Sequence, residues 1–119
     1  MGNKREYNRI PSDLEGMIFL EKGEFPCRYE NLSEVGFLVS TEADVGDVSR
    51  GDVLSFQIID DEEEKIVSGR ASVRWSFKKD GVTQIGCEVQ DVRHEMYMYI
   101  VAKKARQAYL KNASGDSFF

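Results

Sequence analysis

Apolar side chains recur at every second position along much of the chain, which is the pattern of strands that bury one face. The clearest case is the run 66–77, whose alternating apolar residues are Val67, Ala71, Val73, Trp75 and Phe77. This run predicts a strand with those side chains facing a core, and with Arg70 and Arg74 on the opposite face. Trp75 has the phase of a core residue, although its size and indole N–H also suit a stacking wall at a barrel rim.

Five further segments have the composition of strands, and turn residues follow several of them. These segments span 14–20, 24–32, 36–41, 52–59 and 82–89. From about Val92 the apolar spacing becomes helical, with Asp91 as the expected N-cap and an end near Lys111. The stripe expected to face the barrel contains Met96, Ile100 or Val101, Lys104 or Ala105, and Ala108.

A hairpin-rich series of six strands followed by one helix predicts a mainly β fold, a six-stranded antiparallel β-barrel with a C-terminal α-helix. We expect a mobile N-terminal segment at 1–13, the barrel and its helix at 14–111, and a disordered tail at 112–119. Five consecutive acids at 60–64 predict a solvated hairpin loop, with an acidic docking patch or a metal site as the alternatives.

Composition narrows the range of functions. The formal net charge is −5 and the sequence pI is near 4.9, which argues against the broad basic face on which nonspecific nucleic-acid binding depends. Cys27 and Cys87 lack CxxC spacing, so we expect free thiols and no metal site. No apolar run has the length of a membrane span or the position of a secretion signal, so we expect a cytoplasmic protein without membrane insertion.

Basic charge is concentrated at the start of the chain, where Lys4, Arg5 and Arg9 lie within six residues. Arginine is always charged, and its planar fork of donors matches a phosphate or a guanine edge. Arg5 and Arg9 therefore form a candidate clamp for a small anionic ligand. By themselves these six residues favour a solvated N-terminus, because Arg70 and Arg74 repeat the same spacing inside an expected strand.

A second polar motif, Asn31-x-Ser33-x-x-Gly36, lies between the second and third expected strands. On an extended strand Asn31 and Ser33 point to the same face, so an amide and a hydroxyl are offered to one ligand. Gly36 permits positive φ or lets a ligand approach the backbone. A polar turn with a glycine is the simpler interpretation of this motif alone.

Taken together, Arg5-x-x-x-Arg9 before the first strand and Asn31-x-Ser33-x-x-Gly36 after the second resemble the PilZ family of bacterial cyclic di-GMP receptors. The resemblance extends over nearly all of the chain, because that family has a six-stranded antiparallel barrel and a C-terminal helix. It implies a receptor that binds cyclic di-GMP. Because the N-terminal segment has few apolar residues, we expect it to be mobile without ligand, and we expect the nucleotide to draw residues 4–9 against the 31–36 surface. This would change the surface shown to an unidentified protein partner. Apart from this ligand, no cofactor is expected.

The resemblance also implies roles for single residues. Arg5 and Arg9 would contact the phosphates and guanine edges, by forked hydrogen bonds and by stacking. Asn31 would accept from a guanine Watson–Crick edge through its side-chain oxygen, where the family also uses Asp, a stronger acceptor. Ser33 would bond near the base or phosphate, and Gly36 would keep the surface open.

Lys4 and Trp75 are the two further candidate contacts. Lys4 stands just before the arginine pair, where many family members carry another arginine and where ligand stoichiometry is influenced. Lysine keeps the charge but lacks the planar fork, so whether one nucleotide or an intercalated pair binds stays open. Trp75 would supply a stacking wall if its side chain lies outside the core.

Other functions fit the sequence less well. A nucleotide-independent PilZ-like adaptor is the main alternative, with the acidic loop or the tyrosine-bearing helix as its protein contact. An RNA-binding small barrel would need a basic face and an exposed aromatic platform that the sequence does not indicate. No enzyme is expected, because His94 is the only histidine and no nucleophile, base and orienting residue occur at a suitable spacing.

Overall fold

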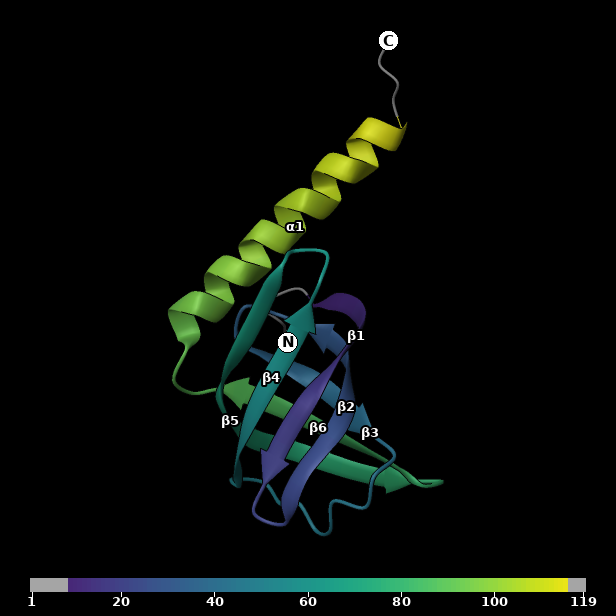
Figure 1. Cartoon of the computed structure of the whole chain (residues 1–119), viewed down its shortest axis with the longest axis vertical. Coiled ribbons are helices and arrows are strands. Elements are labelled where there is room, and N and C mark those ends of the chain that lie inside the picture. The colour runs from purple at the N-terminus through teal and green to yellow at the C-terminus, as the bar shows by residue number, and fades with distance from the viewer. Residues whose placement is uncertain (1–8, 116–119) are drawn as a thin grey trace, which may run out of the picture.

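The strands close into a barrel. In the computed structural model, which describes residues 9–115, the strand order is β1-β2-β3-β6-β5-β4, and β4 pairs with β1 to complete the ring (Figure 1). The elements are β1 (Ile10–Leu20), β2 (Gly23–Leu32), β3 (Gly36–Thr41), β4 (Val53–Asp60), β5 (Lys65–Lys79), β6 (Val82–Val89) and α1 (Arg93–Gly115). All strand pairs are antiparallel. The predicted fold class is confirmed.

Two element ends differ from the sequence-based boundaries by more than two residues. Strand β1 begins at Ile10, so residues 10–13 of the segment expected to be mobile belong to the barrel. Helix α1 runs to Gly115, past the expected end at Lys111 and into the tail expected to be disordered. The rest of those two segments, residues 1–8 and 116–119, lies outside the described residues.

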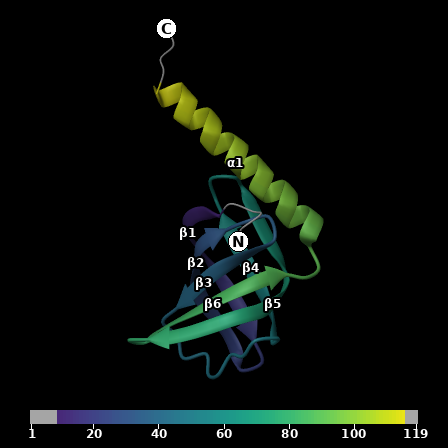
Figure 2. The same ribbon diagram turned by 180° about the vertical axis from the view of Figure 1, so that it is seen from behind.

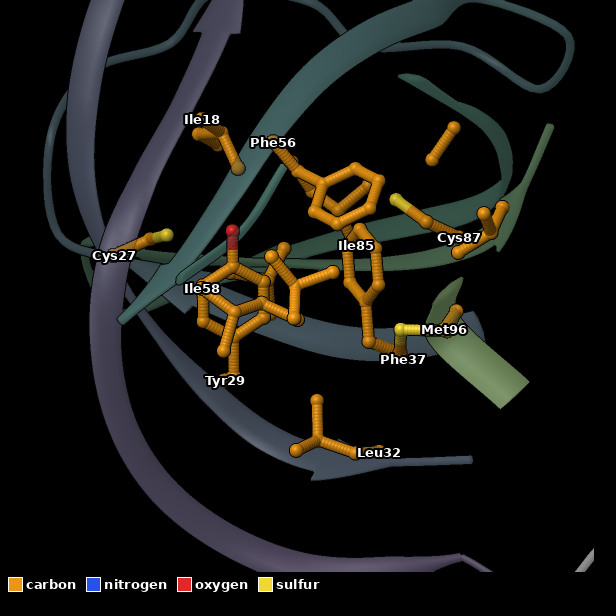
Figure 3. Close-up of a cluster of buried hydrophobic side chains, with 14 of the residues drawn as sticks. Ile18, Cys27, Tyr29, Leu32, Phe37, Phe56, Ile58, Ile85, Cys87 and Met96 are labelled. Atoms are coloured by element: carbon orange, nitrogen blue, oxygen red, sulfur yellow. The ribbon is translucent and has the colours of Figure 1, made fainter. Parts of the chain in front are cut away.

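The core fills the barrel interior with large side chains from every strand (Figure 3). The Phe37 ring lies between Tyr29 and Phe56, with centroid distances of 5.2 Å and 4.9 Å. The buried Tyr29 hydroxyl lies 3.0 Å from each of the backbone oxygens of Met17 and Gln57, so it has a hydrogen-bond acceptor inside the barrel. The interior is therefore solidly packed, and a ligand has to bind on the outside or at an end.

Both cysteines belong to this interior. Cys27 and Cys87 are free and buried, as expected from their spacing in the sequence. Burial raises the pKa of each thiol to about 12. Such thiols stay protonated and unreactive at neutral pH.

A β-bulge changes the phase of β5 between Val73 and Trp75. Val73 is fully buried, but beyond the bulge the inward phase passes to Ser76, which pairs with the buried Ile85. Trp75 and Phe77 consequently face outward and are 45% and 55% exposed. The prediction that both share the buried face is wrong, because the extra residue of a bulge inverts the alternation of the strand that follows it.

Helix α1 lies against one end of the barrel and projects beyond it (Figures 1 and 2). Met96, Tyr99 and Ile100 are buried in this contact, and so is Lys103 one turn later. The Tyr99 hydroxyl and the Lys103 Nζ both donate to Asp60 Oδ2, at 2.7 Å and 2.8 Å. The first acid of the run 60–64 is therefore a buried partner of the chain's own helix, rather than part of a solvated loop.

The outer side of α1 is exposed. Of the stripe predicted from helical spacing, Met96 and Ile100 are buried, whereas Val101, Ala105 and Ala108 are exposed. Among the described residues, no helix combines the length and apolar character needed to cross a membrane.

The connection that leads into α1 also differs from expectation. The Asp91 carboxylate accepts the backbone N–H of Arg70 at 2.8 Å, and its other oxygen lies 3.4 Å from the Arg70 Nε. Asp91 thus joins β5 to the β6–α1 connection. The first α-helical hydrogen bond instead runs from Met96 N to Val92 O, which puts Val92 in the capping position expected for Asp91.

Candidate functional site

The loop between β2 and β3 is closed by Ser33. The Ser33 backbone N–H donates to the Gly36 carbonyl at 2.9 Å, and the Ser33 hydroxyl oxygen lies 3.2 Å from Gly36 N and 3.3 Å from Val35 N. Ser33 is only 3% exposed. Its hydroxyl is therefore directed at the loop backbone and shapes the turn, whereas the sequence predicted an outward position beside Asn31.

Gly36 is required by close packing of two strands. A Cβ at this position would lie 2.1 Å from the carbonyl oxygen of Cys87 on β6. That is far inside any real contact, so only glycine lets β3 start at this point beside Glu88, with which Gly36 pairs. The sequence predicted positive φ or a ligand close to the backbone at Gly36; in the structure the group that approaches is strand β6.

Arg9 and Asn31 connect the two sequence motifs. Arg9 directly precedes β1, and Asn31 lies on β2 opposite Pro11, next to a bulge in the β2–β3 pairing. The Arg9 Nη1 donates to the Asn31 Oδ1 at 2.8 Å, across 22 residues of sequence. Arg9 is exposed and Asn31 half-buried, so both groups are at the surface. Arg5 and Lys4 lie outside the described residues.

An outward row of paired residues extends from Asn31 across three strands. Asn31 pairs with Leu38 on β3, Leu38 with Gly86 on β6, and Gly86 with Trp75 on β5. Directly paired residues of an antiparallel sheet point to the same face, so these positions form one strip of the outer surface. Adjacent strands are about 4.8 Å apart, so Trp75 lies roughly 14 Å from Asn31 along the strip.

Trp75 lies over the strand that separates it from the motif. A Cβ on Gly86 would lie 2.3 Å from the Trp75 Nε1, so the absence of a side chain at Gly86 makes room for the indole on the outside of β6. With the bulge in β5, this glycine fixes Trp75 as an outward ring at the far end of the strip. Trp75 is therefore not a core residue.

The neighbouring charges are largely paired. In the bulge, Arg74 Nη1 lies 2.6 Å from the Glu88 Oε1, and Glu88 itself is the partner of Gly36 in the sheet. Arg9, by contrast, donates to a neutral amide. Arg9 is thus a cation that can bind an anion without first giving up a carboxylate.

Metal binding finds little support in the geometry. Within residues 9–115, no group of three or more His, Cys, Asp or Glu side chains is placed to hold a metal ion. His94 is exposed in the first turn of α1.

Sequence reasoning missed Leu38 and Gly86, which connect the motif to Trp75. Neither residue carries a chemical signal, because one is an ordinary strand leucine and the other a glycine within an apolar run. Their place follows from the register of three strand pairs and from the bulge in β5. Only the glycine in a strand interior hinted at a close approach.

The fold and the surface strip define a small closed barrel whose polar motif lies on its outer face beside the start of the chain. A model of the PilZ domain family matches residues 3–103. The chain therefore belongs to the PilZ domain family. No protein of curated function matches the sequence.

Several solved structures share the fold. The inhibitor of motility MotI (DgrA) from Bacillus subtilis is 22% identical with a TM-score of 0.67, over 87% of this chain and 53% of its own. The PilZ domain of YcgR from Escherichia coli, solved with c-di-GMP, is 16% identical with a TM-score of 0.69, over 90% and 98%. MrkH from K. pneumonia, solved as a c-di-GMP complex, is 12% identical with a TM-score of 0.66, over 97% and 55%. The chain thus spans about half the length of MotI and MrkH.

Proposed function

We propose that this protein is a receptor for cyclic di-GMP, bound on the outer face of the barrel between the N-terminal arginines and the β2–β3 loop. The observation that carries the proposal is the hydrogen bond of 2.8 Å from Arg9 to Asn31, because it brings the two motifs to one place on the surface. Similar PilZ structures from two bacteria were solved with this nucleotide. A cytoplasmic location stays a prediction from the sequence.

The proposed chemistry assigns each residue a task. Arg9, with Arg5, offers guanidinium donors to the phosphates and to the O6 and N7 acceptors of guanine. Asn31 offers its amide oxygen to guanine donors once Arg9 turns to the nucleotide. Ser33 and Gly36 act indirectly, because their contacts hold the loop that carries Asn31.

Trp75 is a proposed stacking surface at the far end of the strip. Every base has a π-face, and stacking on an exposed aromatic ring contributes about 1–3 kcal/mol. The Trp75 backbone lies roughly 14 Å from that of Asn31, but the indole lies over Gly86 on β6, which shortens this separation to roughly 10 Å. A ligand that contacts both residues therefore extends along the strip, and the lysine at position 4 leaves open whether that ligand is one nucleotide or a pair.

The proposed signal is a change of the N-terminal segment. In the structure Arg9 donates one hydrogen bond to Asn31, and the nucleotide would replace this single contact by several charge-assisted hydrogen bonds. Residues 3–9 would then lie against the β2–β3 loop and present a changed surface to a protein partner. Hydrogen exchange of residues 3–9 measures this directly, and equal protection with and without saturating nucleotide would rule out the change.

Calorimetric titration with cyclic di-GMP is the primary test, with GMP as the ligand control. We expect saturable binding that Arg9→Ala abolishes, and a molar ratio that distinguishes one nucleotide from a pair. Arg50→Ala is the matched control, because Arg50 is an exposed arginine in the loop after β3, at the other end of that strand from Gly36. Wild-type protein that gives no heat and no thermal shift at high nucleotide concentration would refute the receptor and favour the nucleotide-independent adaptor.

A further inference from the structure

Helix α1 is held on the barrel by a row of ion pairs as well as by apolar packing. Its cations meet acids on the barrel: Lys103 Nζ is 2.8 Å from Asp60, and Arg106 Nε is 3.6 Å from Glu63. Lys104 Nζ lies 2.9 Å from Glu34 Oε2. The first two pairs join α1 to the hairpin between β4 and β5, whereas Glu34 belongs to the β2–β3 loop.

Glu34 lies in the middle of the β2–β3 loop, within the motif. It follows Ser33 directly and stands between Asn31 and Gly36, so its backbone is part of the turn that carries the amide. The Glu34 side chain is only 13% exposed and the Lys104 side chain 33%, so the pair is partly shielded from water. A shielded pair is screened by salt less than a fully exposed one.

The loop and the helix leave open space beside this ion pair. A cavity of about 220 Å³ remains between them, lined by Val35, Arg93 and Tyr97 as well as by Glu34. Val35 and Tyr97 are 40% and 49% exposed, so neither side chain is fully buried between the loop and the helix. Of the described residues, none hydrogen-bonds the buried Glu34 Oε1. The Glu34 side chain is therefore held through one carboxylate oxygen, Oε2, which contacts Lys104.

We propose that the Glu34–Lys104 ion pair positions the β2–β3 loop for nucleotide binding and thereby couples the nucleotide site to the docking of α1. This inference rests on the proposed function. Glu34 and Lys104 are positioning residues that act through the loop carrying Asn31. Coupling free energies are reciprocal, so a nucleotide that requires the paired loop also tightens the docking of α1. The projecting helix then reports occupancy of the site to a partner.

The sign of one substitution separates this mechanism from simple electrostatics. Cyclic di-GMP carries two phosphodiester charges, so removing the negative charge of Glu34 should tighten binding if only long-range charge matters. If Glu34 positions the loop, Glu34→Gln weakens binding. Lys104→Gln weakens binding under both mechanisms and does not distinguish them by itself.

The experiment is a calorimetric double-mutant cycle at physiological salt. We expect Glu34→Gln and Lys104→Gln each to raise the Kd for cyclic di-GMP about 5-fold, the lower end of measured couplings, because the pair is only partly buried. The double variant should lose no more than either single one. Charge reversal, Glu34→Lys with Lys104→Glu, should restore the Kd to within about 2-fold of wild type. Lys22→Gln, which removes an ion pair with Asp44 next to the other end of β2 from the loop and not on α1, is the control expected to leave the Kd unchanged.

Two results would overturn the inference while leaving the receptor intact. In the first, wild-type protein binds the nucleotide and Glu34→Gln binds it equally well or more tightly. The other is additive losses in the double variant, without rescue by charge reversal. A second measurement is hydrogen exchange of residues 99–106, in which saturating nucleotide should increase protection in wild type and not in Lys104→Gln; no increase in wild type counts against the coupling. Wild-type protein that binds no nucleotide would refute the receptor itself, and the coupling with it.

Discussion

Replacing Trp75 by alanine tests the bulge in β5 and the surface strip together. A buried Trp→Ala change typically costs 3–5 kcal/mol of unfolding free energy, from lost transfer energy and the cavity that remains. Trp75 is 45% exposed and lies on the outside of β6, so about half of the transfer term applies and no enclosed cavity forms. We therefore expect a loss of about 1–2 kcal/mol.

Urea denaturation provides the assay, because the midpoint and slope separate stability from changes in compactness. Val73→Ala is the matched control, since Val73 is fully buried on the other side of the bulge. Two methyl groups at about 0.8 kcal/mol each plus a cavity predict a loss of about 2–3 kcal/mol. A Trp75→Ala loss of about 3 kcal/mol or more, exceeding that of Val73→Ala, would refute the outward placement of Trp75.

The same variant addresses the ligand. Removing a stacking surface worth about 1–3 kcal/mol should weaken cyclic di-GMP binding by roughly 5-fold to 150-fold, while Trp75→Phe should retain most of the affinity. If Trp75→Ala binds cyclic di-GMP as tightly as wild type, Trp75 does not contact the ligand. That result would not affect the outward placement of Trp75 beyond the bulge.

Three further predictions follow from single contacts. Burial alone would raise the pKa of Asp60, but hydrogen bonds from Lys103 and neighbouring groups outweigh the effect of burial and lower the pKa. The stabilising effect of Asp60 is therefore present above its unfolded pKa of about 3.9 and is lost as pH falls through the lower folded pKa. Thermal melts of wild type and Asp60→Asn should therefore converge towards pH 3, and a difference that stays constant from pH 7 to pH 3 would contradict the ion pair. Gly36→Ala should lower stability by at least about 2 kcal/mol in urea, because its Cβ would collide with the Cys87 carbonyl oxygen; a neutral substitution would disprove the close approach. The thiols of Cys27 and Cys87, with pKa raised to about 12, should react with a disulfide reagent at pH 8 only as fast as the protein opens, and burst labelling in native protein would show them accessible.

The number of strands followed from the sequence, since hairpin turns and alternating side chains are local signals. The spatial strand order was not predicted, because β3 pairs with β6 and β1 with β4 across long stretches of sequence. Boundaries were accurate where a glycine or a charged turn ended the apolar run, as for β3 and β6. The phase of β5 could not be predicted past Val73, because an inserted bulge residue carries no composition signal in this strand. The burial of Trp75 was predicted wrongly because the alternation of buried and exposed residues, correct up to Val73, was extended across the bulge.

The helix shows a related limit. Helical spacing correctly identified Met96 and Ile100, but it could not choose which flanking residues the barrel would accept. Lys103 was not expected to be buried, because a lysine is buried only when a partner is present. That partner, Asp60, lies 43 residues away at the end of β4, and sequence distance gives no indication of the pairing.

Within the site, Arg9 and Asn31 are in contact without a nucleotide, whereas the sequence predicted that the nucleotide would draw the N-terminal segment to the loop. The sequence also could not separate binding from shaping roles. Ser33 and Gly36 stand at fixed offsets from Asn31 and were expected to face the ligand. In the structure the Ser33 hydroxyl bonds the loop backbone, and Gly36 is required by the carbonyl of the facing strand. The fixed spacing of the motif therefore reflects what the loop needs to fold as well as what the ligand contacts. Arg5 lies outside the described residues, so its role stays a prediction.

Net charge is a poor guide to the binding surface of this acidic chain. Two acids near the motif, Glu34 and Glu88, are already paired with Lys104 and Arg74, whereas Glu30, next to Asn31, accepts a hydrogen bond from the neutral Ser40 hydroxyl. The charges of Glu34 and Glu88 are largely balanced at short range, and the charge of Arg9 is shared only with a neutral amide. An anion that approaches Arg9 therefore meets a positive charge even though the whole molecule has a formal charge of −5. The same pairing that balances Glu34 ties the loop to the helix, so local neutrality and the proposed coupling arise from one ion pair.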